Sequence, residues 1–391
     1  MARADRVAAI KRIEEIRNHR VITYVTGDRF PIPAQMHDDA LRPIYDQLRS
    51  IGKTESLDLF IYSRGGASDV PWRIANALRM TASKNWSVLI PFRANSAATL
   101  LALGADEIVL GRNGELGPID PSLNLQRITK SPDGGQTMMQ ESVSVEDIMA
   151  YVKFVQERGG LTDQAALSAS MLKLADRIDA ITLGSAYRTH SHIRDVARRM
   201  LSSSKAKHEP QVVDGIIETL AEKVYAHGHA ITFGDALAVG LPVKQAPANL
   251  DDAMWDLLAA YEADLKLRTP IDAQAKIVGK DEYTEDVTSA AVETTAYGFE
   301  FNGQFFVKAK RQMPTTLNVT LSIVLQAPVG PAPAPSAGQG GANALEQLLQ
   351  NAQAQLQQLA QDAAKAAVAQ QAPVVGMDAG VRNGEWRRVE N

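Results

Sequence analysis

The chain contains no cysteine, which excludes a disulfide framework, a thiolate metal site and a cysteine nucleophile. It also lacks a strong charge of either sign, because 41 lysines and arginines face 45 aspartates and glutamates, for a formal net charge of -4. Proteins that bind nucleic acid usually carry a basic surface, so we expect no nucleic-acid partner. Metalloprotease, P-loop and dinucleotide-binding motifs are absent as well, and we therefore expect no metal and no cofactor.

The sequence also lacks long apolar runs. No window of the sequence reaches the roughly 18 apolar residues that a membrane-spanning helix requires. The N-terminal segment MARADRVAAIKRIEEIRNHR spreads its charges throughout and has no apolar core of the kind that a signal peptide needs. We therefore expect a cytoplasmic protein that has no membrane partner.

Predicted strands and helices alternate in the N-terminal third of the chain. The apolar runs LDLFIY (57–62), WSVLIPF (86–92) and DEIVLG (106–111) have the composition of strands that are covered on both faces. A helix with one apolar face is predicted after the first run, and a small-residue helix, AATLLALGA (97–105), after the second. Strands that alternate with helices predict an α/β domain with a parallel sheet.

The composition changes further along the chain. Residues 1–268 are predicted to form one globular domain. Residues 269–326 are rich in threonine, aromatic and β-branched residues, and Asn302-Gly303 predicts a hairpin turn there. After this β-rich extension we expect three segments: a Pro/Gly/Ala linker at 327–341, an amphipathic helix with leucines at coiled-coil spacing at 342–370, and a flexible tail at 371–391.

Two turns stand out because each ends a predicted buried strand and opens a helix, where the first backbone N–H groups have no partner within the helix. The first is Ser63-Arg64-Gly65-Gly66 and the second surrounds Ser96. The Ser96 hydroxyl would lie at the positive end of a helix, and the N–H of Ala97 could face a developing oxyanion. The Gly-Gly pair could supply a second N–H, because a backbone without side chains approaches a substrate closely. Such a geometry is typical of acyl-transfer catalysis.

Four motifs in one order resemble a known family. They are SRGG (63–66), NSAATLLALGADEI (95–108), LGPIDP (116–121), and HGHAIT (227–232) followed by GLPV (240–243). Together they resemble the serine dehydrogenase proteinase family, which lies in the superfamily of the Clp protease proteolytic subunit and crotonase and is related to signal peptide peptidase A. The resemblance covers roughly residues 20–265.

The resemblance implies an α/β fold of the Clp/crotonase type, which is a spiral of ββα units. Residues 1–268 would be its peptidase domain, followed by the C-terminal β-rich extension and a short C-terminal helix. It also implies a Ser-Asp-His triad in chain order, with Ser96 as nucleophile, Asp120 as orienting carboxylate and His227 as general base. The backbone groups that bind the substrate would come from both turns: Gly65, Gly66, Ala67, Ser68 and Ala97.

Each of these assignments has an alternative. Ser96 could serve only as the cap of the helix that follows it, and Asp120 could be an ordinary turn residue. Relatives often carry an aspartate after the histidine, where this chain has Gly228, and His229 is the base if the register differs by two residues. A Ser-Lys dyad of the signal peptide peptidase type would instead use one of three lysines: Lys130, Lys153 or Lys173.

We therefore interpret the sequence as a soluble serine peptidase that acts on peptides or proteins, and we favour the triad over the dyad. The resemblance also implies a homo-oligomer. The first alternative is a catalytically silent scaffold that recruits a partner protein through its C-terminal β region or helix. A crotonase-like acyl-CoA enzyme is a more distant alternative, because such enzymes use the two N–H donors without a serine.

Overall fold

The computed structural model describes most of the chain, and for part of it only the backbone. The described residues are 3–120, 122–130, 136–223, 229–311, 353–354, 356–364 and 374–390. Side chains are not described at 122–130, 136–143 and 222–223. The chain forms two compact units, the first made of 1–271, 286–304 and 383–391 and the second of 272–285 and 305–382.

The main sheet has eight strands in the order β12-β11-β10-β1-β2-β3-β5-β9. Their bounds are β1 (Arg20–Thr26), β2 (Thr54–Tyr62), β3 (Ala82–Ile90), β5 (Glu107–Leu110), β9 (Val243–Gln245), β10 (Glu282–Glu293), β11 (Gly298–Arg311) and β12 (Val374–Val389). Strands β1, β2, β3, β5 and β9 run parallel to one another, whereas β10 pairs with β1 in the antiparallel direction. The predicted parallel sheet and the α/β class are therefore confirmed.

The helices are α1 (Arg3–Arg17), α2 (Leu41–Ile51), α3 (Val70–Thr81), α4 (Ala97–Leu103), α5 (Val145–Glu157), α6 (Gln164–Ala175), α7 (Ala180–Ser203), α8 (Pro210–Glu218), α9 (Phe233–Ala238), α10 (Ala248–Asp264) and α11 (Ala273–Ile277). Short helical turns span η1 (Asp38–Ala40) and η2 (Thr219–Lys223). Two small sheets pair β4 (Arg93–Ala94) with β6 (Glu115–Leu116) and β7 (Ser122–Lys130) with β8 (Gln136–Ser144). Among the described residues, no helix is both long and apolar enough to cross a membrane.

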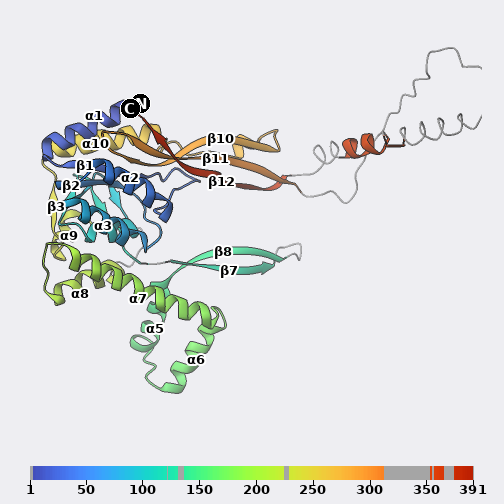
Figure 1. Ribbon diagram of the computed structural model, residues 1–391. Helices are drawn as coiled ribbons and strands as arrows, with labels where there is room; N and C mark the ends of the chain where they lie inside the picture. The colour runs from blue at the N-terminus through green and yellow to red at the C-terminus, as the bar shows by residue number, and fades with distance from the viewer. Residues whose placement is uncertain are drawn as a thin grey trace, which may run out of the picture. The chain divides into compact units, whose positions relative to one another are not determined.

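Helices cover both faces of the parallel strands. Along β2, Leu59 and Ile61 belong to one core cluster while Phe60 and Tyr62 belong to another, because successive side chains point to opposite faces of a strand. The first cluster includes residues of α2, α3, α4 and α7, and the second includes residues of α1 and α10. Figure 1 shows α1 and α10 together on one side of the sheet, with α2 and α3 on the other. This double cover explains why the strand sequences are almost continuously apolar.

Two features of the C-terminal region correct the sequence-based expectations. Strand β11 continues through Asn302 and Gly303, and the turn between β10 and β11 is instead closed by the Thr294 N–H, which donates to the Tyr297 carbonyl over 3.2 Å. The Asn302 side chain accepts a hydrogen bond of 2.7 Å from Thr288 on β10. Pairing along β10 therefore outweighs the local preference of Asn-Gly for a turn.

The expected flexible tail is the second correction, because residues 374–389 form strand β12 next to β11. The Trp386 ring meets the edge of Phe301 with centroids 5.5 Å apart, and the Arg388 guanidinium lies 4.0 Å from the Tyr297 ring centre. These contacts add to the strand hydrogen bonds and order the segment. The expected C-terminal β-rich extension is thus present. The expected linker at 327–341 and most of the helix at 342–370 lie outside the described residues, although 356–364 is helical.

Candidate active site

The first turn follows β2 and can be built only with glycine. Gly65 has φ 97° and Gly66 has φ 154°. The Met36 N–H donates to the Gly65 carbonyl over 2.7 Å, and the Ala67 N–H donates to the Met36 carbonyl over 2.8 Å. A β-carbon on Gly66 would lie 2.1 Å from the Met36 carbonyl oxygen. The segment around Met36 therefore presses directly against this turn.

The second turn places Ser96 in a strained conformation. Ser96 precedes α4 and has φ 53° and ψ −117°, and its side chain makes no capping hydrogen bond. A residue other than glycine at positive φ costs about 1–3 kcal/mol and persists only where the surrounding structure enforces it. A serine that served only as a helix cap would accept a hydrogen bond from the helix and would not need a strained conformation. This conformation exposes a serine hydroxyl at a helix N-terminus, as a nucleophile requires.

The fold brings the two turns into contact. A β-carbon on Gly65 would lie 2.8 Å from the Ser96 β-carbon and 2.9 Å from the Ala97 nitrogen. The Gly65 N–H donates to the Ser63 hydroxyl oxygen over 3.0 Å, so it is already used. Among the described residues, the N–H groups of Gly66 and Ala97 have no hydrogen-bond acceptor. Each of the two contacting turns thus has one N–H donor, that of Gly66 or that of Ala97, without an acceptor among the described residues.

The expected substrate-binding segment shows one constraint. Ala67 and Ser68 are half-buried next to the first turn. The Ala67 N–H is bonded to Met36, and its carbonyl accepts from the Val70 N–H over 3.4 Å. Pairing of this segment with a substrate strand stays a prediction, and it would have to use other backbone groups than these two.

The candidate carboxylate lies in a segment that touches Ser96. The Ser96 N–H donates to the Pro118 carbonyl over 3.1 Å. Asp120, two residues further on, is only 7% exposed and accepts from the Ser144 hydroxyl over 3.5 Å. Burial at this position exceeds what an ordinary turn aspartate would show.

The candidate histidine His227 lies outside the described residues, but the residues on both sides of it do not. The Ile119 N–H donates to the Leu220 carbonyl over 3.0 Å. Leu116 and Ile231 exchange two backbone hydrogen bonds of 3.0 and 2.8 Å. Segment 116–119 therefore anchors the chain before and after residues 224–228. The same segment accepts the hydrogen bond from the Ser96 N–H.

The alternative bases lie in exposed positions where the structure describes them. His229 is exposed, and so are Lys153 and Lys173. The Thr232 hydroxyl lowers the pKa of Asp235, and the Thr232 amide and a weaker contribution from His229 act in the same direction. The side chain of Lys130 is outside the described residues.

An acidic residue that sequence reasoning missed also contacts both turns. Asp28 accepts hydrogen bonds from the Tyr62 hydroxyl at 3.0 Å, from Arg64 at 2.8 Å and from Arg93 at 3.4 Å. Burial raises the pKa of Tyr62, and the neighbouring Asp28 adds to this rise. Both Asp28 and Met36 come from the segment that follows β1, and no local motif marks them. In the described part of the chain, no group of three or more His, Asp or Glu residues could hold a metal ion.

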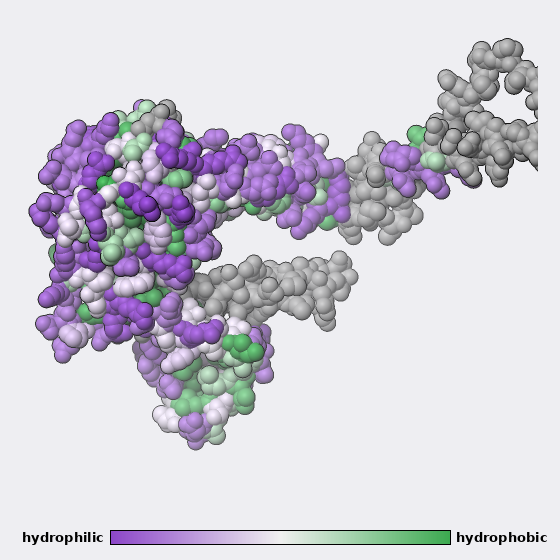
Figure 2. Space-filling view, viewed as in Figure 1, coloured by the Kyte–Doolittle hydropathy of each residue, from purple (hydrophilic) through white to green (hydrophobic). Residues whose placement is uncertain are grey.

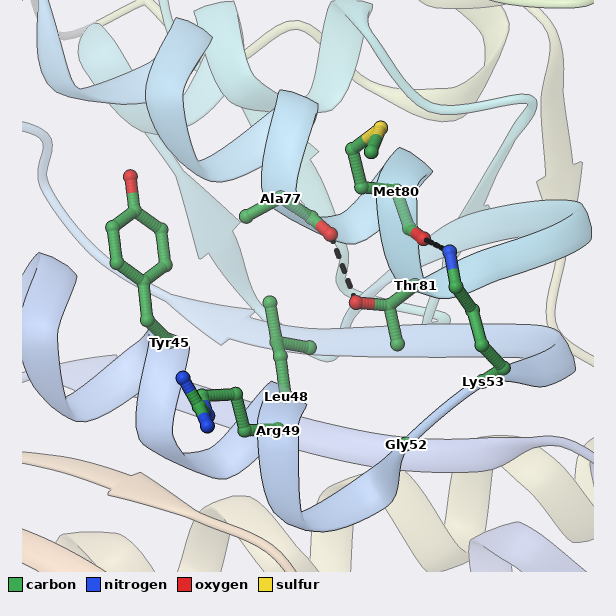
Figure 3. Close-up of a pocket in the computed structure, with 8 residues that line it drawn as sticks. All are labelled: Tyr45, Leu48, Arg49, Gly52, Lys53, Ala77, Met80 and Thr81. Atoms are coloured by element: carbon green, nitrogen blue, oxygen red, sulfur yellow. Dashed lines mark hydrogen bonds between the residues drawn. The ribbon is translucent and has the colours of Figure 1, made fainter.

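A cavity of about 370 Å³ lies elsewhere, between the C-terminal ends of α2 and α3 (Figure 3). Its lining includes Tyr45, Arg49, Lys53 and Met80. Its lining residue Lys53 directly precedes β2, whereas Ser63 directly follows it, and a strand of nine residues spans about 30 Å. The two cations lie next to helix C-termini, and Lys53 donates to the Met80 carbonyl, so they complement the helix dipoles. This cavity is therefore not part of the candidate active site.

Comparison with known proteins finds one family that matches the N-terminal third of the chain. Residues 1–131 match the model of the ClpP-like SDH-type serine proteinases. The resemblance to that family is confirmed over this range. The match supports a serine peptidase in general, and it includes Ser96 and Gly66 but not His227.

Two uncharacterized proteins of Methanocaldococcus jannaschii are similar to the chain. MJ0137 is 25% identical over 277 residues, which are 68% of this chain and 82% of that protein. MJ1495 is 32% identical over 124 residues, which are 30% of this chain and 42% of that protein. Among solved structures, a mutant of the 1510-N membrane-bound stomatin-specific protease is 13% identical, with a TM-score of 0.31 over 54% of this chain and 75% of that one.

The first turn yields a prediction about stability. We expect Gly66→Ala to destabilise the protein by at least about 2 kcal/mol, because its β-carbon would collide with the Met36 backbone. Gly160→Ala is the matched control: it also has positive φ, 63°, but no atom lies within 4 Å of the added carbon, so about 1 kcal/mol of backbone strain remains. Urea unfolding measures both, and equal losses would contradict the close approach.

Proposed function

We propose that the chain is a serine peptidase that hydrolyses peptide bonds through an acyl-enzyme on Ser96. One observation carries the proposal: a strained, uncapped serine lies against a glycine turn, and one N–H group in each of these two turns, those of Gly66 and Ala97, has no acceptor in the described part of the chain. A structural turn has no need for two unused donors next to a strained hydroxyl. The family match over residues 1–131 supports the same chemistry.

The mechanism follows from these positions. A general base removes the Ser96 proton while the hydroxyl oxygen attacks the substrate carbonyl. The carbonyl oxygen becomes an oxyanion, which accepts hydrogen bonds from the N–H groups of Gly66 and Ala97. Collapse of the tetrahedral intermediate expels the amine, which takes the proton from the base. Water then attacks the acyl-enzyme in the same way and releases the acid.

For the base we propose His227, oriented by Asp120. Asp120 is buried in the segment whose Pro118 carbonyl holds the Ser96 backbone, and the same segment anchors Leu220 and Ile231 on either side of residues 224–228. His229, by comparison, is exposed beside Asp235.

We also propose that the chain forms a homo-oligomer, and that α5, α6 and α7 take part in the interface. No residue of α6 is buried, although its sequence QAALSASMLKLA is mostly apolar. Phe154 on α5, Leu172 on α6, and Ile181 and Tyr187 on α7 are all exposed. Figure 2 shows hydrophobic residues gathered over these helices. A second copy would remove this apolar surface from water. A cytoplasmic location and a partner for the C-terminal region stay predictions.

The nucleophile is tested by Ser96→Ala. We expect this variant to lose labelling by a fluorophosphonate probe and to lose peptide hydrolysis by at least about 10³-fold, because the attacking oxygen is gone. Its unfolding midpoint should not fall, since the replacement removes no hydrogen bond of the side chain. Full labelling of Ser96→Ala would reject the proposal, and an unlabelled wild type would favour the silent scaffold.

The base is tested by pH and by mutation together. With a histidine base, kcat/KM should rise through an ionisation near the reference pKa of about 6.5, because only neutral imidazole accepts the proton. His227→Ala should cost about 10⁴-fold or more, Asp120→Asn about 10²- to 10⁴-fold, and the double variant little more than His227→Ala.

The exposed neighbour His229→Ala is the matched control and should keep its activity. Activity that survives in both histidine variants but is lost in Lys130→Met would replace the triad with the dyad. In that case kcat/KM would climb toward alkaline pH, because a lysine must lose its proton to act as a base.

The interface is tested by changing one apolar side chain to a charge. We expect wild-type protein to run as an oligomer in light scattering at micromolar concentration. Ile181→Asp, at a position that is 86% exposed, should lower the mass because it buries a charge in the interface. The exposed Val278→Asp, on a different part of the chain, is the control. A monomeric wild type would contradict the proposal.

A further inference from the structure

A buried hydroxyl holds the glycine turn in place. Ser63 is fully buried at the end of β2. Its hydroxyl oxygen accepts a hydrogen bond of 2.8 Å from the Thr26 hydroxyl and one of 3.0 Å from the Gly65 N–H. The Thr26 bond reaches across to β1, so it fixes Ser63 against the sheet and not only within its own turn. Because Gly65 is bound in this way, the next N–H, that of Gly66, is the one left for a substrate.

A second buried hydroxyl holds the serine turn. The Thr99 hydroxyl oxygen lies 2.7 Å from the Ala94 carbonyl oxygen and 2.8 Å from the Gly117 carbonyl oxygen, and it accepts from the Gly117 N–H over 3.2 Å. Its proton serves either of the two carbonyls. Thr99 therefore links Ala94, which precedes Asn95 and Ser96, to segment 116–119. The Pro118 carbonyl of that segment accepts the Ser96 N–H.

The Thr99 bonds differ from those of an ordinary helical threonine. Thr81 and Thr219 each donate to the carbonyl four residues earlier in their own helices, Ala77 and Gly215. This is the usual local solution for a threonine in a helix. Thr99 instead reaches outside α4 to a distant segment.

We propose that Ser63 and Thr99 are positioning residues that set the distance between Ser96 and the N–H donors of Gly66 and Ala97; the inference rests on the proposed peptidase function. Neither hydroxyl contacts the Ser96 oxygen in the described structure. They act through the backbone of the two turns, which also bond directly, since the Asn95 N–H donates to the Ser63 carbonyl over 3.0 Å. Oxyanion donors must lie about 2.7–3.1 Å from the developing charge, and a shift of about 1 Å costs roughly 10²-fold in rate.

The test uses Ser63→Ala and Thr99→Val in the full chain, with a peptide substrate. We expect kcat to fall by about 10- to 10²-fold while KM changes less than about threefold, because the lost alignment matters in the transition state. Thr99→Ser keeps the hydroxyl and should recover most of the rate. Thr26→Val removes the donor to Ser63 and should resemble Ser63→Ala.

Thr23→Val is the matched control for a purely structural role. Thr23 lies on β1 and is also fully buried, and its hydroxyl lies 2.6 Å from the hydroxyl of Tyr261 on α10. The Thr23→Val variant should lower Tm as Thr99→Val does but leave kcat unchanged.

An equal loss of kcat in Thr23→Val, or unchanged kcat in Ser63→Ala and Thr99→Val, would overturn the inference while Ser96-dependent hydrolysis persists. If Thr99→Val does not fold, Ser63→Ala and Thr26→Val decide the question. Wild-type hydrolysis that survives Ser96→Ala would instead reject the proposed function itself.

Discussion

The parallel pairing of β2 with β3 is the constraint on which the candidate site depends. The two strands align Leu57 with Trp86 and Phe60 with Leu89, so they end at the same edge of the sheet. Beyond that edge Ser63 bridges to Ala94. The glycine turn and the serine turn are therefore neighbours because their strands are neighbours. A slip of one residue would exchange the side chains that β2 contributes to its two core clusters, so the close packing of each cluster fixes the register.

The strain at the two turns is offset by packing close to them. All seven residues of α4 are buried, so the helix that follows Ser96 is held on every side. Burial of one leucine contributes about 1.5–3 kcal/mol, which is comparable to the cost of Ser96 at positive φ. The small residues Ala97 and Ala98 let the start of α4 come close to the neighbouring backbone. The same closeness explains why Gly65 has no room for a side chain.

Strand β10 shows how the first unit uses a segment far along the chain. It pairs with β1, and Glu293 at its end is fully buried. Arg6 on α1 donates to this carboxylate at 2.8 Å, and the Tyr261 hydroxyl donates to it at 2.6 Å. Burial raises the pKa of Tyr261 well above its ordinary value, so the hydroxyl keeps its proton and remains a donor. Removing one member of such a buried group leaves the others uncompensated, which makes the network a strong link between α1, α10 and β10.

Local patterns determined the elements that a short stretch of sequence can specify. The apolar runs before Ser63 and Ser96 predicted buried parallel strands, and the residues after them predicted turns into helices, because strand, turn and helix preferences depend on near neighbours. The sequence also pointed to Ser96 and Gly66. Tertiary structure alone decided that Met36 closes the glycine turn, that Ser63 and Thr99 hold both turns, that β11 runs through Asn302, and that residues 374–389 are a strand. Each of these contacts joins backbone or hydroxyl groups from separate segments, and no local preference encodes which distant segment a folded chain will place beside a given residue.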